Sequence, residues 1–236
     1  MRLYKLLSLL LCLSMLLVGG CGDDNAKTKA DGSGAYLTMT DAAGRQVVLP
    51  KKPERVVSLS PSYLSLIEAV DGKIIGRATS KTGTIPESMK SVAEVGFVYN
   101  VNTESVVGLK PDLVLASKSQ HEKLIPLLES NKINVVEFNA KTYDEVKKTI
   151  TMLGDIYGTA DKAKAENAAL DNQINEITKK LPKDKKKIVI MHATASSVTV
   201  EGSRSIAGCV SDILGFDNVA AASVSYTHLR AHETEL

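Results

Sequence analysis

Short apolar runs rich in valine, isoleucine and leucine alternate with segments of helical periodicity along most of this chain. The runs with the length of buried strands are residues 55–59, 74–76, 112–116 and 135–138. Strands that alternate with helices are typical of βαβ units around a mostly parallel sheet. Residues 37–49, with a turn at 41–44, predict an opening hairpin. The sequence therefore predicts an α/β fold.

Residues that can cap helices stand between these runs, because their side chains can accept a hydrogen bond from a free backbone N–H. They are Ser60 before Pro61, Asn102, the pair Ser119 and Glu122, and the pair Thr142 and Glu145. This pattern predicts helices after residue 60, over 102–109, from 119 to about 130, and from 142 to 157.

Residues 159–181 contain neither glycine nor proline and predict one long helix. Its length at 1.5 Å per residue is about 34 Å, which is enough to pass from one lobe to another. Pro182 and a lysine-rich turn, more simply a solvated turn than an anion site, precede a strand at 188–191. We expect an N-terminal α/β lobe at 37–158, an interlobe helix at 159–182 and part of a second α/β lobe at 183–223.

The N-terminus has the pattern of a bacterial lipoprotein signal. Arg2 and Lys5 precede an apolar run at 6–18, and two glycines lead into Cys21. This pattern predicts a signal peptide at 1–20, a lipid on Cys21 and a flexible tether at 21–36, with the protein held outside the cytoplasmic membrane. A signal peptide cut elsewhere and a plain membrane anchor are the alternatives.

The C-terminus resembles a translated sequencing adaptor over VSYTHLRAHET, residues 224–234. We therefore expect residues 224–236 to be non-native and the second lobe to be truncated. His228 and His232 have the spacing of a zinc pair on a helix, and we assign them no function.

Composition argues against a disordered, a collagen-like and a disulfide-scaffold chain. The chain has 236 residues, 44% hydrophobic and 24% charged, with 29 Lys and Arg against 27 Asp and Glu. These values are typical of a globular protein, and a net charge of +2 does not indicate a nucleic-acid partner. Outside the signal and the lipid site, the single cysteine is Cys209, which we expect to be a core thiol rather than a nucleophile.

Motifs for catalysis are missing from the sequence. No GxGxxG follows a predicted strand, Ser80 occupies the place of the second glycine of a P-loop, and His121-Glu122 lacks the second histidine of a metalloprotease helix. We therefore expect no enzyme activity. An enzyme or redox protein on a Rossmann-like scaffold is the alternative.

Open α/β sheets bind ligands at the carboxyl ends of their parallel strands. The loops predicted there are 60–63, 78–82, 117–119, 139–141 and 192–197, and the aromatic segment 96–100 is a further candidate. The candidate ligand contacts in them are Ser60, Tyr63, Thr79, Tyr99, Ser117 and His192. At each loop the alternative is a turn whose hydroxyl groups satisfy backbone atoms.

Two motifs together carry a resemblance to a known family. TDAAGR at 40–45 and VVGLKPDLVLAS at 106–117, followed at the right spacing by the long helix, resemble the helical-backbone periplasmic binding proteins. These proteins serve ABC importers of ferric siderophores, haem and cobalamin. The resemblance implies two lobes joined by a rigid helix and a ligand between them. It also implies a monomeric receptor without an intrinsic cofactor, whose partners are a permease and its ATPase.

The resemblance also assigns roles to single residues. Glu104 matches a carboxylate that docks to the permease, although a first-turn glutamate also favours its own helix dipole. Tyr99 falls where haem-binding relatives place an axial ligand, and a phenolate is a suitable donor to ferric iron. Tyr63, Ser117 and His192 match positions that line the cleft, with core packing as the alternative. Haem is a narrow preference over a ferric siderophore and cobalamin.

Overall fold

The computed structural model describes residues 34–81, 83–181, 184–193, 198–221 and 227–229. The signal peptide, Cys21 and most of the tether lie outside the described residues, as does most of the tail at 224–236. Within the described part of the chain, no helix has both the length and the apolar character needed to cross a membrane.

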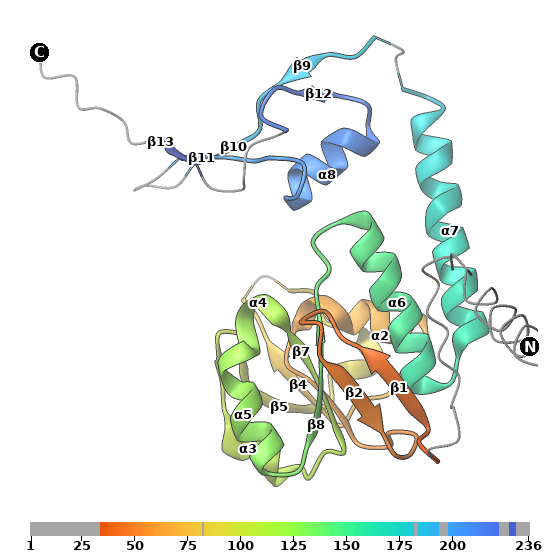
Figure 1. Ribbon diagram of the computed structural model, residues 1–236, viewed down its shortest axis with the longest axis vertical. Coiled ribbons are helices and arrows are strands. Elements are labelled where there is room, and N and C mark those ends of the chain that lie inside the picture. The colour runs from red at the N-terminus through yellow and green to blue at the C-terminus, as the bar shows by residue number, and fades with distance from the viewer. Residues whose placement is uncertain (1–33, 82, 182–183, 194–197, 222–226, 230–236) are drawn as a thin grey trace, which may run out of the picture.

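A six-stranded sheet forms the centre of the N-terminal lobe (Figure 1). Its strands are β3 (Val56–Ser58), β4 (Gly76–Thr79), β5 (Ala93–Phe97), β6 (Asn100–Val101), β7 (Leu113–Ser117) and β8 (Asn134–Phe138). They are ordered β6-β5-β4-β3-β7-β8, and every pair is parallel except β5 with β6. The α/β prediction is confirmed. The chain adds β4, β5 and β6 on one side of β3, and then returns to add β7 and β8 on the other side. The strand order therefore reverses between β3 and β7.

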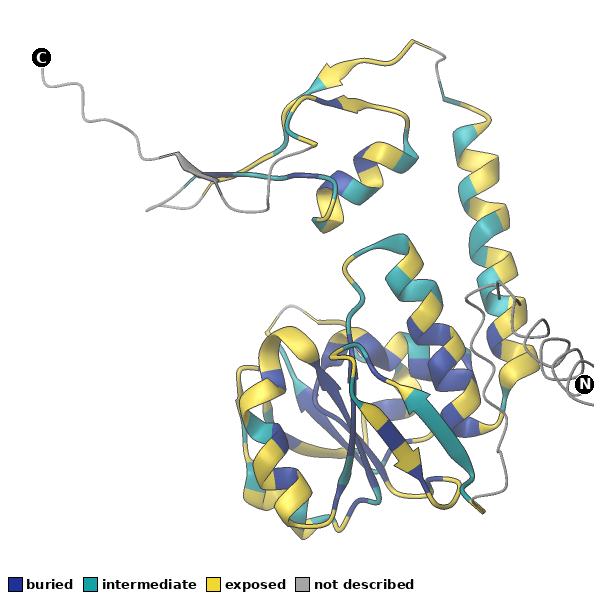
Figure 2. Ribbon diagram, in the orientation of Figure 1, coloured by how far each residue is buried: buried dark blue, intermediate teal, exposed yellow. Residues whose placement is uncertain are grey.

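Both faces of this sheet are buried (Figure 2). Leu113 and Leu115 point into one core, whereas Val114 and Ala116 point into a second, because successive side chains of a strand face opposite ways. The first core is closed by α2 (Leu64–Ala69), α6 (Tyr143–Tyr157) and the hairpin of β1 (Leu37–Thr40) with β2 (Gln46–Leu49). The second is closed by α3 (Thr103–Gly108) and α5 (Ile125–Ser130).

The first motif, TDAAGR, is a structural element of the hairpin. The carboxylate of Asp41 accepts hydrogen bonds from the backbone N–H groups of Ala43 and Arg45, and the Arg45 guanidinium lies 2.7 Å from it. Gly44 has φ of +83°, which glycine adopts without strain. The backbone N–H of Glu137 in β8 also donates to Asp41. The motif therefore closes the turn and attaches it to the sheet edge.

The second motif has a similar role at the opposite end of the strands. The carboxylate of Asp112 accepts hydrogen bonds from the backbone N–H groups of Glu54 and Arg55, both at 3.0 Å. The Arg55 guanidinium in turn donates to the carbonyls of Leu109 and Lys110. These contacts join the segment before β3 to the segment before β7, so LKPDLV helps to set the register of these two neighbouring strands.

Helix α7 (Ala160–Thr178) leads from the N-terminal lobe to a second unit (Figure 1). At 1.5 Å per residue its 19 residues span about 28 Å. Its middle part is attached to α6: Asp171 accepts hydrogen bonds from Lys147 at 2.6 Å and from the Tyr143 hydroxyl at 2.8 Å. Burial, and to a smaller extent the hydrogen bond to the Asp171 carboxylate, raises the pKa of Tyr143 to about 12.

The second unit contains short elements. They are β9 (Lys187–Ile188), β10 (Met191–Ala193), β11 (Val198–Val200), α8 (Ile206–Ile213), β12 (Asp217–Asn218) and β13 (Thr227–Leu229). β9 pairs with β12 in parallel, and β10, β11 and β13 form an antiparallel sheet. The predicted single strand at 188–191 is wrong, because the chain leaves the β12 pairing after Ile188 and joins β11 from Met191.

Two further predictions about the N-terminal lobe need correction. The strand expected at 74–76 is β4, which begins where that prediction ended and includes the charged Arg77. Arg77 is buried in the strand because its guanidinium donates to the Met89 carbonyl and to Glu94. Ser60 precedes the turn η1 (Pro61–Tyr63) as expected, but its side chain makes no capping hydrogen bond.

The capping box expected at Ser119 and Glu122 is also wrong. The helix begins directly after β7 as α4 (Lys118–His121), then continues through η3 (Glu122–Leu124) into α5. The Ser119 hydroxyl lies 3.2 Å from the Ser117 hydroxyl, and the backbone N–H of Ser117 donates to the His121 ring. The box at Thr142 and Glu145 is confirmed in full at the start of α6.

Candidate ligand-binding face

The loops that follow β3 and β7 meet at the point where the strand order reverses. The Leu59 N–H donates to the Leu115 carbonyl at 2.9 Å, so Ser60, just after β3, and Ser117, the last residue of β7, lie at the same end of the sheet. Crevices at such reversals are where open α/β sheets bind ligands. We call the loops at this end of β3, β4, β5, β7 and β8 the ligand face. Both serines are buried in the described conformation, at 3% and 7% exposure.

The turn between β5 and β6 presents an aromatic side chain on this face. Gly96 has φ of +101°, and a side chain at this position would approach the Asn100 carbonyl within 2.7 Å, so the hairpin requires glycine there. Tyr99, at the tip, is 83% exposed, and Phe97 beside it is 50% exposed. The phenol of Tyr99 is therefore free to meet a ligand from solvent.

A chain of hydrogen bonds connects this turn with two other loops of the ligand face. The Val98 N–H donates to the Thr79 carbonyl at 2.9 Å. The Val98 carbonyl accepts from Nε2 of His121 at 2.8 Å, and Nδ1 of His121 accepts from the Ser117 N–H at 3.0 Å. Three predicted contact residues, Thr79, Tyr99 and Ser117, thus belong to segments that the structure ties together.

His121 joins two loops of this face, and sequence reasoning did not single it out for this contact. Its side chain is 1% exposed, and because Nδ1 accepts a backbone N–H, the proton of the neutral ring must be on Nε2. Burial lowers the pKa of His121 from its ordinary value of 6.5, against the opposing effect of the Val98 carbonyl. A lone histidine four residues after Ser117 has no local signal for this role, since Val98 lies 23 residues away in sequence.

Tyr63 is a core residue and does not line a cleft, which corrects the prediction. It is 3% exposed, its hydroxyl donates to the Phe138 carbonyl at 3.0 Å, and its ring packs edge-on against that of Phe138 at 5.5 Å. Burial raises the pKa of Tyr63, while the nearby Ser117 hydroxyl has a smaller opposing effect. The alternative of core packing therefore describes Tyr63.

The second unit supplies His192 and Cys209. His192 lies exposed on β10, and its carbonyl accepts from the Thr199 hydroxyl at 3.3 Å. Cys209 in α8 is half-buried, and the expectation of a core thiol is wrong because its sulfur faces the other lobe. The Tyr143 N–H at the start of α6 donates to this sulfur at 3.3 Å. The start of α6 is therefore a point of contact between the two units.

The remaining predicted site residue, Glu104, is exposed in the first turn of α3. Asn102 caps that helix by accepting a hydrogen bond from the Ser105 N–H at 2.9 Å, as predicted. Among the residues that the structure describes, no three His, Cys, Asp or Glu side chains are placed to hold a metal ion together.

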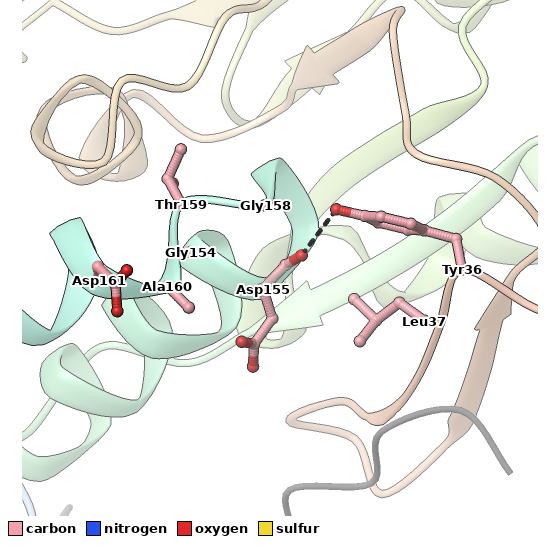
Figure 3. A pocket seen from close by; sticks show the side chains of 8 residues that line it. All are labelled: Tyr36, Leu37, Gly154, Asp155, Gly158, Thr159, Ala160 and Asp161. Carbon is pink, nitrogen blue, oxygen red and sulfur yellow. Dashed lines mark hydrogen bonds between the residues drawn. The ribbon is translucent and has the colours of Figure 1, made fainter.

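Two hollows differ in their relation to this face. One of about 180 Å³ lies at the carboxyl end of β8 and is bordered by Lys118, Asn139 and Lys148. A more open one of about 340 Å³ lies where α6 ends and α7 begins, and there the Tyr36 hydroxyl donates to the Asp155 carbonyl at 3.2 Å (Figure 3). The second hollow contains none of the predicted contact residues, whereas the first adjoins the loops at 117–119 and 139–141.

The model of the family described as periplasmic binding protein matches residues 56–231, about three quarters of the chain. The chain belongs to the periplasmic binding protein family. The aspartates of the two motifs hold the turn of the hairpin and the segments before β3 and β7.

Relatives of this family member are found in several bacteria. The uncharacterized ABC transporter substrate-binding lipoprotein YvrC of Bacillus subtilis is 32% identical over 197 residues, covering 78% of this chain and 62% of the relative. The Fe(3+)-citrate-binding protein YfmC of the same organism is 27% identical over 234 residues, covering 95% of this chain and 73% of the relative. The chain spans under two thirds of the length of YvrC.

Solved structures share the fold. An ABC transporter substrate-binding protein from Listeria monocytogenes has a TM-score of 0.68 at 20% identity, covering 75% of this chain and 69% of its own. IsdE of Staphylococcus aureus, solved with haem, has a TM-score of 0.62 at 27% identity, covering 70% of this chain and 64% of its own.

Proposed function

We propose that this chain is the ligand-binding receptor of an ABC importer for an iron or corrinoid chelate. The observation that carries the proposal is the convergence of the Ser60 loop, the Ser117 loop and the exposed Tyr99 turn on one end of a doubly wound sheet. Relatives named for iron citrate, a siderophore, haem and cobalamin support the ligand class. Because YvrC is named as a transporter substrate-binding protein and YfmC as a binding protein, an enzyme is not favoured.

The proposal extends to attachment and partners. In it, a lipid on Cys21 holds the receptor at the outer side of the cytoplasmic membrane, and the receptor works as a monomer that delivers its ligand to a permease driven by an ATPase. YvrC and YfiY, both named lipoproteins, support the anchor. The exposed carboxylate of Glu104 is the proposed docking contact on the N-terminal lobe. His192 is the proposed contribution of the second unit to the ligand.

Haem is the first ligand to test. The exposed phenol of Tyr99 suits axial coordination of ferric iron, since a tyrosinate is a known haem ligand in proteins. The relative IsdE, named as a haem uptake protein, is 27% identical over 185 residues. Ferric siderophore, ferric citrate and cobalamin are the competing ligands.

Titration of the full chain with haemin tests this proposal. We expect a shift of the Soret band in the wild type and loss of that shift in Tyr99→Phe, which keeps the ring and removes the oxygen donor. Tyr36→Phe is the matched control, because its hydroxyl bonds the end of α6 in the hollow of Figure 3. An unchanged shift in Tyr99→Phe would refute the role of Tyr99. A wild type that binds none of haemin, ferric citrate, a ferric catecholate or cobalamin would refute the receptor.

A further inference from the structure

We propose that His121 is a positioning residue that makes the Tyr99 turn and the Ser117 loop move as one unit of the ligand face. The expected effect on ligand binding rests on the proposed function, whereas the coupling of the two loops rests on the contacts of His121 alone. His121 itself is buried, so its effect on a ligand must act through the two loops it joins.

Both nitrogen atoms of the ring are used, each toward a different loop. Nδ1 accepts from the Ser117 N–H at 3.0 Å, and Nε2 donates to the Val98 carbonyl at 2.8 Å. Val98 directly precedes Tyr99, and Ser117 ends β7 at the reversal of strand order. One neutral imidazole therefore supplies both the acceptor and the donor that hold these loops at a fixed separation.

The order of the strands makes this connection more than a local one. β5, which carries the Tyr99 turn, and β7, which carries Ser117, are separated in the sheet by β4 and β3. Through the sheet, the turn is held by the hydrogen bond from the Val98 N–H to the Thr79 carbonyl on β4. His121 adds a second attachment that passes over two strands, β4 and β3, from the turn after β5 to the end of β7. A displacement of the turn is thereby transmitted to Ser117.

The physical cost of losing the ring supports this role. Val98 and Ser117 are themselves buried, at 8% and 7% exposure, so neither backbone group gains a full replacement from water when the ring is removed. The loops must then separate to hydrate the freed carbonyl and N–H. Movement of both loops together, rather than of either one, is the specific consequence.

Two substitutions separate the hydrogen bonds from the volume of the ring. His121→Phe keeps an aromatic ring and removes both bonds, whereas His121→Gln keeps one acceptor and a donor on a planar group. Tyr157→Phe is the matched control, because it deletes a buried hydrogen bond to the Lys73 carbonyl, a contact that involves none of the loops of the ligand face.

Amide hydrogen exchange of the full chain measures the coupling without a ligand. We expect His121→Phe to accelerate exchange about tenfold in residues 97–101 and in 115–121 together, with β8 unchanged. His121→Gln restores part of the protection, and Tyr157→Phe leaves both segments as in the wild type. Acceleration in one segment alone, or in neither, would overturn the proposal. Loss of protection in β8 as well shows that His121→Phe has unfolded. In that case faster exchange of both segments in His121→Gln, with wild-type exchange in Tyr157→Phe, supports the proposal. Equal exchange of the two segments in His121→Gln and Tyr157→Phe overturns it.

Haemin titration of the same variants measures the consequence for binding. We expect about tenfold weaker binding in His121→Phe, partial recovery in His121→Gln and no change in Tyr157→Phe. Wild-type affinity in His121→Phe with accelerated exchange would overturn the effect on the ligand. If the wild type binds no chelate, the proposed function fails, while the exchange experiment still accepts or rejects the coupling of the two loops.

Discussion

The packing of α6 against α7 leads to a prediction that the structure makes quantitative. A side chain at Gly154 in α6 would collide with the methyl group of Ala163 in α7 and would lie 3.3 Å from the Thr159 carbonyl. Ala163 is the buried residue of α7, at 2% exposure. The substitution Gly154→Ala must therefore push the base of α7 away from the N-terminal lobe.

The expected magnitude combines two opposing effects. Alanine is more favourable than glycine inside a helix by about 1 kcal/mol, whereas forcing an extra methyl group into a packed contact costs about 1–3 kcal/mol. We expect Gly154→Ala to lower the free energy of unfolding by about 0–2 kcal/mol, the difference between these two effects. Gly108→Ala is the matched control, since a side chain at Gly108 in α3 meets no atom within 4 Å. That variant should be unchanged or more stable by up to about 1 kcal/mol.

Urea unfolding followed by circular dichroism measures both variants. In thermal unfolding, each kcal/mol corresponds to a shift of about 2–4 °C for a chain of this size. The double variant Gly154→Ala with Ala163→Gly removes the opposing methyl group, so its loss should be smaller than the sum of the two single losses by about 1 kcal/mol. If Gly154→Ala stabilises the protein as much as Gly108→Ala does, the close contact of α6 and α7 is refuted.

The remaining predictions concern the hairpin and the buried histidine. Asp41→Ala should lower the free energy of unfolding by about 3 kcal/mol, because the Asp41 carboxylate is fully buried and paired with Arg45. Glu129→Ala, which removes a half-exposed partner of the same Arg45, should lower it by about 0.5 kcal/mol. Equal losses of the two variants in urea unfolding would contradict this. Because burial lowers the pKa of His121, the unfolded state takes up its proton first as the pH falls, so stability should be full above about pH 6.5 and decline below it. His121→Gln should remove part of that decline, and an identical pH profile for the variant would disprove the assignment.

Local patterns in the sequence predicted the elements whose hydrogen bonds close within a few residues. The cap at Asn102 and the capping box at Thr142 each join groups three positions apart, and the hairpin at 37–49 pairs residues 6 to 12 positions apart across a single turn. The alternation of apolar runs with segments of helical periodicity was sufficient to predict an α/β fold. Their common feature is that the partner of each group is near in the chain.

Partners that are distant in the chain were decided by the tertiary structure. The failed capping box at Ser119 has the correct local spacing, but the helix begins at Lys118 directly after β7, so Ser119 lies inside its first turn and cannot cap it. Tyr63 has the sequence position of a cleft residue, yet a carbonyl 75 residues away accepts its hydroxyl proton and holds it in the core. Arg77 can lie in a strand because Glu94, directly opposite it on the neighbouring strand β5, pairs with its guanidinium.

The sequence by itself therefore determined the scaffold of this protein, including the two motifs that hold its hairpin and its central strands, because those features depend on short-range patterns and on which residues avoid water. The tertiary structure decided which side chains meet at the ligand face and which single ring connects them. The physical reason is that one imidazole can satisfy two backbone groups only where the folded sheet brings Val98 and Ser117 to opposite sides of it.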